Sequence, residues 1–225
     1  MSSAFELATA AQLLEKRRQA AAAGGRRPLV THVAALDALQ GGGLHRGSLI
    51  ELHGSRSSGR LSIALAALTA ATAAGEAAAL IDCGDHLDPQ AAQACGVELA
   101  RLLWLRPRRL KDALSCAEMA LAAGLALVAL DLGERPARGA PFAAWLRLAR
   151  AAKAQNAVLL LLAPRPTAGT AADVVVRALR ARPVWNAEGS GQTPLLAGLD
   201  ARLVVERHRG PAGAGGAVAL PLRER

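Results

Sequence analysis

Apolar residues along this chain follow two patterns: short uninterrupted runs, and longer alanine-rich segments in which they recur every three or four positions. Short runs of this kind are typical of buried strands, and the three- and four-residue spacing is typical of helices with one apolar face. The runs predict strands beginning at Leu49 and over residues 77–82, 100–105, 125–130 and 157–163. The spaced segments predict helices over residues 61–74, 89–95, 111–123 and 141–155. Because strands and helices alternate, we expect an α/β fold with a largely parallel twisted sheet flanked by helices.

The pattern changes at both ends of the chain. Near the N-terminus, residues 4–23 have helical spacing and are followed by Gly24-Gly25, so residues 1–27 are predicted to be a helical arm and linker. The remaining residues, 28–225, are predicted to form one core domain that opens with a short strand-like segment at 30–35. After Asp173 the helical segments end, and strands are predicted over 174–180, 201–206 and 218–222. Successive strands without helices between them indicate an antiparallel extension of the sheet.

The composition narrows the class of protein. Hydrophobic residues make up 52% of the chain but aromatic residues only 2%, so the core must be built from Ala, Leu and Val. No apolar run approaches the roughly 18–20 residues of a membrane span, and the N-terminus lacks the apolar region of a secretory signal. The cysteines at 83, 95 and 116 are odd in number and lack the spacing of metal ligands. We therefore expect a cytoplasmic protein with reduced, buried thiols and no membrane contact.

The charge of the chain is strongly positive. The formal net charge is +9, and only three of the 27 basic residues are lysines. One interpretation is attraction to nucleic acid or to an acidic partner. The other is a GC-rich genome that favours Ala, Arg and Gly codons, since the basic residues are scattered rather than gathered in one stripe.

A glycine-bounded loop joins the strand at Leu49 to the helix that begins near residue 61. Its two glycines have the spacing of the phosphate-binding P-loop, G-x-x-x-x-G-K-[ST], whose backbone N–H groups and helix N-terminus hold phosphate. Arg60 stands where Lys is expected, and Leu61 stands where a hydroxyl would hold Mg²⁺; Arg cannot simply replace Lys. The candidate nucleotide-binding residues are Gly54, Ser55, Arg56, Ser57, Ser58, Gly59, Arg60, Leu61 and Ser62. We expect hydrolysis to be lost or very weak, and binding of ATP or ADP stays open beside a purely structural role for the loop.

Four aromatic and imidazole side chains stand out along the chain. His53 alternates with apolar residues in the first predicted strand, which indicates a core or site-edge position. Trp104, Trp145 and Trp185 are predicted to be core or interface anchors. Trp185, in an arginine-rich segment, could also meet a partner or nucleic acid.

The residues from Gly47 to Arg60 resemble the P-loop strand of bacterial RecA recombinases. Further segments resemble the same family in the same order: Leu80-Ile81-Asp82, Leu87-Asp88-Pro89, Cys95-Gly96-Val97, residues 125–131 and residues 202–211. The resemblance covers roughly residues 30–222 and implies a RecA-like P-loop core.

The departures from that family concern its chemistry. Gly84 stands at the position of the catalytic glutamate, with Asp85 one residue away, and Ala91 stands at that of the adenine-stacking tyrosine. The γ-phosphate-sensing glutamine falls near Pro164. The two DNA-binding loops are shortened to about residues 133–141 and 165–171.

The resemblance also assigns roles to four charged residues. Asp88 matches the adenine-edge contact, although capping of the helix opened by Pro89 explains it equally. Asp131 matches the Walker B carboxylate, with either a metal role or a hydrogen bond to the P-loop. Arg207 and Arg209 match a basic pair that contacts the neighbouring subunit, or they are two solvated arginines.

Shortened, degenerate RecA relatives of this size resemble the ImuA family of the bacterial damage-inducible mutagenesis cassette. That resemblance implies a non-catalytic accessory protein of translesion DNA synthesis that requires no cofactor or metal. Its implied partners are ImuB, indirectly an error-prone DnaE-type polymerase, and RecA, whose filaments it would cap or modulate; DNA binding would be weak. The implied location is cytoplasmic and nucleoid-associated. The alternative is a weak nucleotide-dependent ATPase that acts as a recombination mediator and binds DNA.

Overall fold

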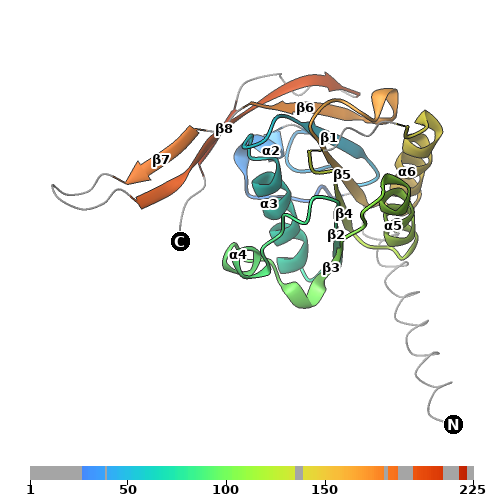
Figure 1. The fold of residues 1–225 in the computed structure, drawn as a ribbon, viewed down its shortest axis with the longest axis horizontal. Coiled ribbons are helices and arrows are strands. Elements are labelled where there is room, and N and C mark those ends of the chain that lie inside the picture. The colour runs from blue at the N-terminus through green and yellow to red at the C-terminus, as the bar shows by residue number, and fades with distance from the viewer. Residues whose placement is uncertain are drawn as a thin grey trace, which may run out of the picture.

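The computed structural model describes residues 27–38, 40–134, 139–179, 182–186, 195–209 and 218–221 (Figure 1). Its centre is one nine-stranded sheet with the order β3-β2-β4-β5-β1-β6-β8-β7, and β9 also pairs with β8. The parallel strands are β1 (Leu49–His53), β2 (Ala78–Asp82), β3 (Leu102–Leu105), β4 (Leu127–Asp131) and β5 (Val158–Ala163). The helices are α2 (Ala34–Ala38), α3 (Arg60–Ala73), α4 (Pro89–Ala94), α5 (Leu110–Ala122) and α6 (Phe142–Ala154), with 3-10 turns at Leu99–Arg101 and Gly169–Ala171. The predicted α/β class with a mostly parallel sheet is therefore confirmed.

Helices cover both faces of the parallel sheet, and each face has its own apolar cluster. In Figure 1, α3 and α4 lie on one side of the strands and α5 and α6 on the other. The α3 side includes Ile63 and Leu68 packed on alternate strand residues such as Leu80. The α5–α6 side includes Trp145, which is 2% exposed, and Leu148. Strands buried on both faces explain the continuous apolar runs of the sequence.

The strand order determines where the polar loops meet. β1, β2, β4 and β5 are parallel neighbours, so the residues that follow their carboxyl ends lie along one edge of the sheet. Asp82 and Asp131 are paired in register at the ends of β2 and β4. In open α/β sheets this edge is the usual position of ligand sites.

The C-terminal part of the sheet is antiparallel, as predicted. β6 (Val174–Ala178) is parallel to β1 on one side and antiparallel to the 14-residue β8 (Leu195–His208) on the other. β7 (Arg182–Asn186) and β9 (Val218–Pro221) both pair with β8 in antiparallel fashion. In Figure 1, β7 and the first part of β8 project away from the helix-covered core. β7 was not expected from the sequence, because Pro183 disfavours a paired strand.

The predicted strand at 30–35 is wrong. Only Leu29 makes an isolated bridge, to Leu44, and residues 34–38 form the short helix α2. Asp37 accepts hydrogen bonds from the backbone N–H and the hydroxyl of Thr31, which tie the chain into a turn. His32, with φ of 60°, breaks the extended backbone between them. The predicted arm at 1–27 lies outside the described residues except for Arg27.

The cysteines form no disulfide, but the expectation of three buried thiols is wrong. Cys95 is exposed, whereas Cys83 and Cys116 are partly buried. Among the described residues, no helix has the length and apolar character needed to cross a membrane.

Candidate functional site

The P-loop connects β1 to α3 and has the tight backbone that its glycines predict. A Cβ on Gly54 would overlap the carbonyl oxygen of Ala178 and lie 2.8 Å from Ser58 Oγ, so glycine is required there. Gly59 has φ of 84°, in the left-handed region, directly before the first residue of α3. Ser55, Arg56 and Ser57 are exposed, and Ser58 is buried. The loop therefore has the tight turn after Gly54 and the left-handed residue before α3 that its two glycines predict.

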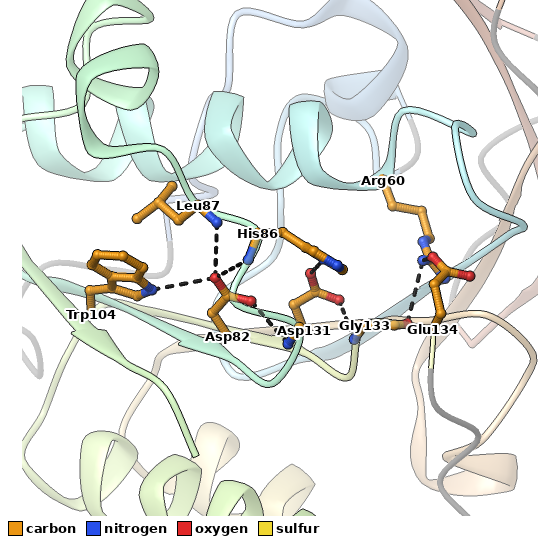
Figure 2. A network of polar contacts seen from close by, with 9 residues as sticks. Arg60, Asp82, His86, Leu87, Trp104, Asp131, Gly133 and Glu134 are labelled. Atoms are coloured by element: carbon orange, nitrogen blue, oxygen red, sulfur yellow. Dashed lines mark hydrogen bonds and ion pairs between the residues drawn. The ribbon is translucent and has the colours of Figure 1, made fainter. Parts of the chain in front are cut away.

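Arg60, at the position of the P-loop lysine, is held by residues of its own chain. Its side chain is 8% exposed, and Nη2 donates to Glu134 Oε1 at 2.6 Å and to the Gly133 carbonyl at 3.5 Å (Figure 2). Nη1 of Arg60 and the hydroxyl of Ser58 are buried and have no hydrogen-bond partner among the described residues. Of the two terminal nitrogens of Arg60, one is therefore bound to the described part of the chain and the other is not, and the Ser58 hydroxyl is likewise unbound there.

Leu61 and Ser62 follow Arg60 in the first turn of α3, and both are partly buried. Leu61 has no atom that could coordinate Mg²⁺. Ser62 is one residue further, about 100° around a 3.6-residue helix, so its hydroxyl does not replace the one that is missing at 61.

Asp82 is a buried carboxylate whose oxygens are occupied by the chain's own donors. Oδ2 accepts from the backbone N–H of His86 at 2.8 Å, from that of Leu87 at 3.0 Å, and from the indole of Trp104 at 3.4 Å. Oδ1 accepts from the N–H of Gly84 at 3.2 Å. Asp82 therefore fixes the loop after β2 (Figure 2).

Asp131, the match to the Walker B carboxylate, lies beside Asp82 at the end of β4. Oδ1 accepts from the N–H of Gly133 at 2.8 Å, and Oδ2 lies 3.7 Å from His86 Nδ1. Burial raises the pKa of Asp131 above its ordinary value; the Gly133 N–H, Arg60 and His86 oppose this rise, and Asp82 adds to it. This hydrogen bond shapes the loop after β4. The two roles predicted for Asp131, a metal role or a hydrogen bond to the P-loop, stay predictions.

His86 fills the space beside Gly84. A Cβ on Gly84 would lie 2.5 Å from His86 Nδ1, so the ring occupies the volume that a side chain at position 84 would need. Asp85 has φ of 55° and is paired with Arg106 at 3.3 Å, with 63% of its side chain exposed. It does not take the place of the missing glutamate.

These residues fit a nucleotide phosphate only in part. The loop backbone, Ser58 Oγ and Arg60 Nη1 could hold an anion. The magnesium and the attacking water lack the groups that would hold them, because position 61 is Leu and position 84 is Gly. Asp82, His86 and Asp131 have ligand atoms within 4.8 Å of one another, but Asp82 already accepts four hydrogen bonds. We therefore derive no metal-dependent step for this site.

Asp88 caps α4, as one of its two predicted roles requires. Its side chain accepts from the N–H groups of Gln90 and Ala91, directly before Pro89 at the first helical position. Ala91 is exposed and offers no aromatic ring.

Arg207 points back into its own chain. Its Nη2 donates to the carbonyls of Gly169 and Ala172, at the 3-10 turn that follows β5. Arg209 is exposed, and its backbone N–H donates to the Asp173 carbonyl at 2.7 Å. The interface role of the pair stays a prediction, with Arg209 better placed than Arg207 to reach a neighbour.

Sequence patterns did not point to four residues that organise this region. Glu134 neutralises Arg60, and His86 faces Asp131. Glu51, fully buried in β1, accepts from the N–H groups of Thr167 and Ala168. Glu206 joins His53 at 2.8 Å and Arg177 at 3.2 Å. For Glu51, its position as a charged residue inside an apolar strand could have indicated a special role. The sequence offered no comparable signal for Glu134, His86 or Glu206.

Residues 27–132 match the family model of the RecA N-terminal domain. The protein RecA of Rhodococcus jostii is 42% identical over 113 residues, which cover 48% of this chain and 31% of that protein. The protein RecA of Mycobacterium marinum is 43% identical over 99 residues, covering 43% and 29% of the two chains. This part of the chain is therefore RecA-like, and the chain spans about a third of the length of the curated relatives it matches.

The crystal structure of the RadB recombinase is similar in fold. It superposes with a TM-score of 0.65 and 19% sequence identity, and the match covers 88% of this chain and 97% of that chain. At this identity the likeness establishes the fold alone, and it extends the RecA-like architecture beyond residue 132.

Proposed function

We propose that this chain is a non-catalytic RecA-like accessory protein of damage-induced translesion DNA synthesis, of the ImuA type, that acts by contact with partner proteins. ImuB is the expected direct partner, an error-prone DnaE-type polymerase the indirect one, and RecA a further one. The expected location is the cytoplasm, at the nucleoid. Support comes from the RecA-like region together with the altered site.

One observation carries the non-catalytic part of the proposal. The P-loop retains its backbone, but its cation, Arg60, is bound to Glu134 of the same chain, and His86 fills the space beside Gly84. Phosphoryl transfer depends on placing a cation, a metal ion and a water around the γ-phosphate. The cation is present as Arg60, whereas the positions that would hold the metal ion and the water in the family pattern are Leu61 and Gly84.

The rival function, a weak ATPase acting as a recombination mediator, is tested by turnover. Pure protein should hydrolyse no ATP above background, with or without single-stranded DNA. Turnover that disappears in Gly59→Asp but persists in the matched surface variant Gly75→Asp would contradict the proposal. Gly75 suits this purpose because it also has a positive φ, 79°, lies at the other end of α3 and has open space around its Cα.

Partner binding is tested by gel filtration and pull-down of the full chain with ImuB and with RecA. We expect a stable complex with ImuB whose amount is the same with ATP, ADP or no nucleotide. A complex that forms only with nucleotide would contradict the contact mechanism, and no complex with either protein would contradict the proposed function.

The effect on RecA filaments is tested separately. A protomer that retains a RecA-like core without its ATP chemistry should shorten RecA filaments on single-stranded DNA at substoichiometric ratios. Unchanged filament length and strand exchange would remove capping from the proposal while leaving ImuB binding in place. Arg209→Ala is the variant of choice, because its side chain is exposed.

A second candidate function, weak DNA binding, is favoured by one arrangement of arginines. Arg177 pairs in register with Val204, and Arg182 pairs with Asp200. Since side chains alternate along a strand, Arg202 shares the face of both. Arg177, Arg182 and Arg202 are exposed on this face of the extension, and Trp185 of β7 is 55% exposed. Glu206, which pairs with Arg177, reduces the charge of the row.

Binding of a single-stranded oligonucleotide should weaken steeply with salt if this row contacts phosphates. Arg202→Glu should weaken binding by about tenfold, since it replaces one phosphate contact by a repulsion. Arg150→Glu, an exposed arginine on α6, is the control. Equal losses in both variants would indicate attraction by net charge alone.

A further inference from the structure

The cation of the P-loop has an anionic partner in its own chain. Arg60 Nη2 lies 2.6 Å from Glu134 Oε1; the arginine side chain is 8% exposed and the glutamate 40%. A buried guanidinium is stable only when an opposite charge accompanies it. Asp131 is the other carboxylate that acts on Arg60, but Glu134 makes the direct contact.

The loop after β4 is built to deliver Glu134 to this position. Asp131 accepts from the Gly133 N–H, and Gly133 has φ of 62°. A Cβ on Gly133 would lie 3.2 Å from the Cα of Gly84, so the loop rests directly on the loop after β2. Two glycines in contact thus allow the chain to turn toward Arg60.

The Glu134 carboxylate binds the Arg60 guanidinium, which is the group expected to contact a nucleotide phosphate in this loop. In the P-loop pattern, the residue at position 60 contacts the β- and γ-phosphates. Arg60 Nη1 and Ser58 Oγ lie in the same loop, buried and without a hydrogen-bond partner among the described residues. The single carboxylate of Glu134 therefore occupies one donor of this loop, Arg60 Nη2, and leaves Arg60 Nη1 and Ser58 Oγ without a partner among the described residues.

We propose that Glu134 is a built-in counter-anion that holds Arg60 in place of a nucleotide phosphate. The P-loop is then neutralised without nucleotide, and an external phosphate must displace Glu134 to bind. The inference goes beyond the proposed function, because it concerns what stabilises the loop and does not depend on any partner protein.

The test compares the thermal unfolding midpoints of the full chain and its Glu134→Gln variant in a buffer free of phosphate and sulfate. The variant should unfold about 3–6 °C lower, since it leaves Arg60 without its direct counter-charge. Glu118→Gln is the matched control: Glu118 also pairs with an arginine and is 39% exposed, but its partner Arg147 is 60% exposed. The control should change the midpoint by about 1 °C or less.

Inorganic pyrophosphate then distinguishes a counter-anion from an ordinary ion pair. At equal ionic strength, pyrophosphate should restore the midpoint of Glu134→Gln and bind it about tenfold more tightly than it binds the unaltered chain, as removal of a competing like charge predicts. The double variant Arg60→Leu/Glu134→Gln should show no such rescue. A midpoint of Glu134→Gln equal to that of Glu118→Gln, or equal rescue of all four proteins, would overturn the proposal.

Failure of this test leaves the partner assays untouched, and failure of the partner assays leaves this one untouched. The Arg60–Glu134 contact also supports the non-catalytic part of the proposed function, and the ATP turnover assay tests that part on its own.

Discussion

Glu51 lies in the centre of the sheet, fully buried, with one oxygen holding the chain after β5. Oε1 accepts from two backbone N–H groups, and Oε2 has no hydrogen-bond partner among the described residues. Burial raises the pKa of Glu51 above its ordinary value of 4.5; the N–H groups of Ala168 and Thr167, and then His53 and Arg207, reduce the rise. This carboxyl therefore binds its proton more tightly in the folded chain than in the unfolded chain.

The consequence is a pH dependence with a definite sign. The contribution of Glu51 to the free energy of unfolding is fully present below its unfolded pKa and is lost as the pH rises through its raised folded pKa. Glu51→Gln should therefore show a smaller fall of this free energy than the unaltered chain as the pH rises from about 4.5. Urea unfolding at a series of pH values measures the difference. Parallel curves for the two proteins, or a steeper fall in the variant, would show that the carboxyl is not titrated in this way.

Gly84 allows a second test at the scale of a single residue. Gly84→Glu restores the family's carboxylate, but its Cβ would lie 2.5 Å from His86 Nδ1. We expect a loss of about 1–3 kcal/mol in the free energy of unfolding, the usual cost of overpacking. Gly84→Glu alone should not raise ATP turnover above that of the unaltered chain, because Arg60 and Leu61 are unchanged.

Removal of the obstructing ring provides the control for Gly84→Glu. His86→Ala in the same chain should recover most of the lost stability, as measured by urea unfolding. If Gly84→Glu alone is as stable as the unaltered chain, the His86 ring moves aside without cost, and this prediction is wrong.

Among the secondary-structure elements, the alternation of strand and helix was predictable, because each parallel strand is buried on both faces and each helix on one. The P-loop, the cap at Asp88 and the antiparallel C-terminal strands were also predictable from local patterns. The strand predicted at 30–35 was wrong because Thr31 and Asp37 bind across a turn. β7 was missed because Pro183 and two polar ends hide a five-residue strand. Both errors arise because hydrophobic periodicity registers neither side-chain hydrogen bonds nor a strand interrupted by proline.

The charged contacts of the site were harder to predict than its elements. Arg60 and Glu134 are 74 residues apart, and His86 and Asp131 come from loops after different strands. No spacing rule relates such pairs. They become neighbours only because β2, β4 and β1 end along one edge of the sheet.

Glu206 shows how one side chain joins three strands. From β8 it contacts His53 at the end of β1 and Arg177 in β6. Glu206→Gln keeps the shape but weakens the contacts with His53 and Arg177, so we expect a loss of about 1 kcal/mol in the free energy of unfolding. Faster amide hydrogen exchange in β6 should accompany it. If amide exchange in β6 is unchanged and Glu206→Gln loses no more stability than Glu118→Gln, solvent screens the contacts of Glu206 and they add little to stability.

For the molecule as a whole, the sheet separates two apolar clusters. Ile63 belongs to the cluster on the α3 side and Ile81 to that on the α5–α6 side, at 2% and 0% exposure. Ile→Val at each position should cost about 0.5–1.5 kcal/mol. Because the two side chains belong to different clusters, the double variant should show the sum of the two losses within about 0.5 kcal/mol. A larger departure, measured by urea unfolding, would reveal coupling through the sheet.

The close contact between Gly84 and Gly133 also limits which side chains these two positions can accept. A side chain at position 84 meets His86, and one at position 133 meets the Cα of Gly84. To match the family's ATPase pattern, the chain would need four changes: a carboxylate at 84, a smaller residue at 86, a hydroxyl at 61 and a lysine at 60. The change at position 60 would also give Glu134 a different partner. The first of these changes is expected to cost stability, so a carboxylate at 84 would be tolerated best together with a smaller residue at 86. The packing of these two loops therefore disfavours a side chain at position 84, whereas exposed positions elsewhere on the fold can change without that cost.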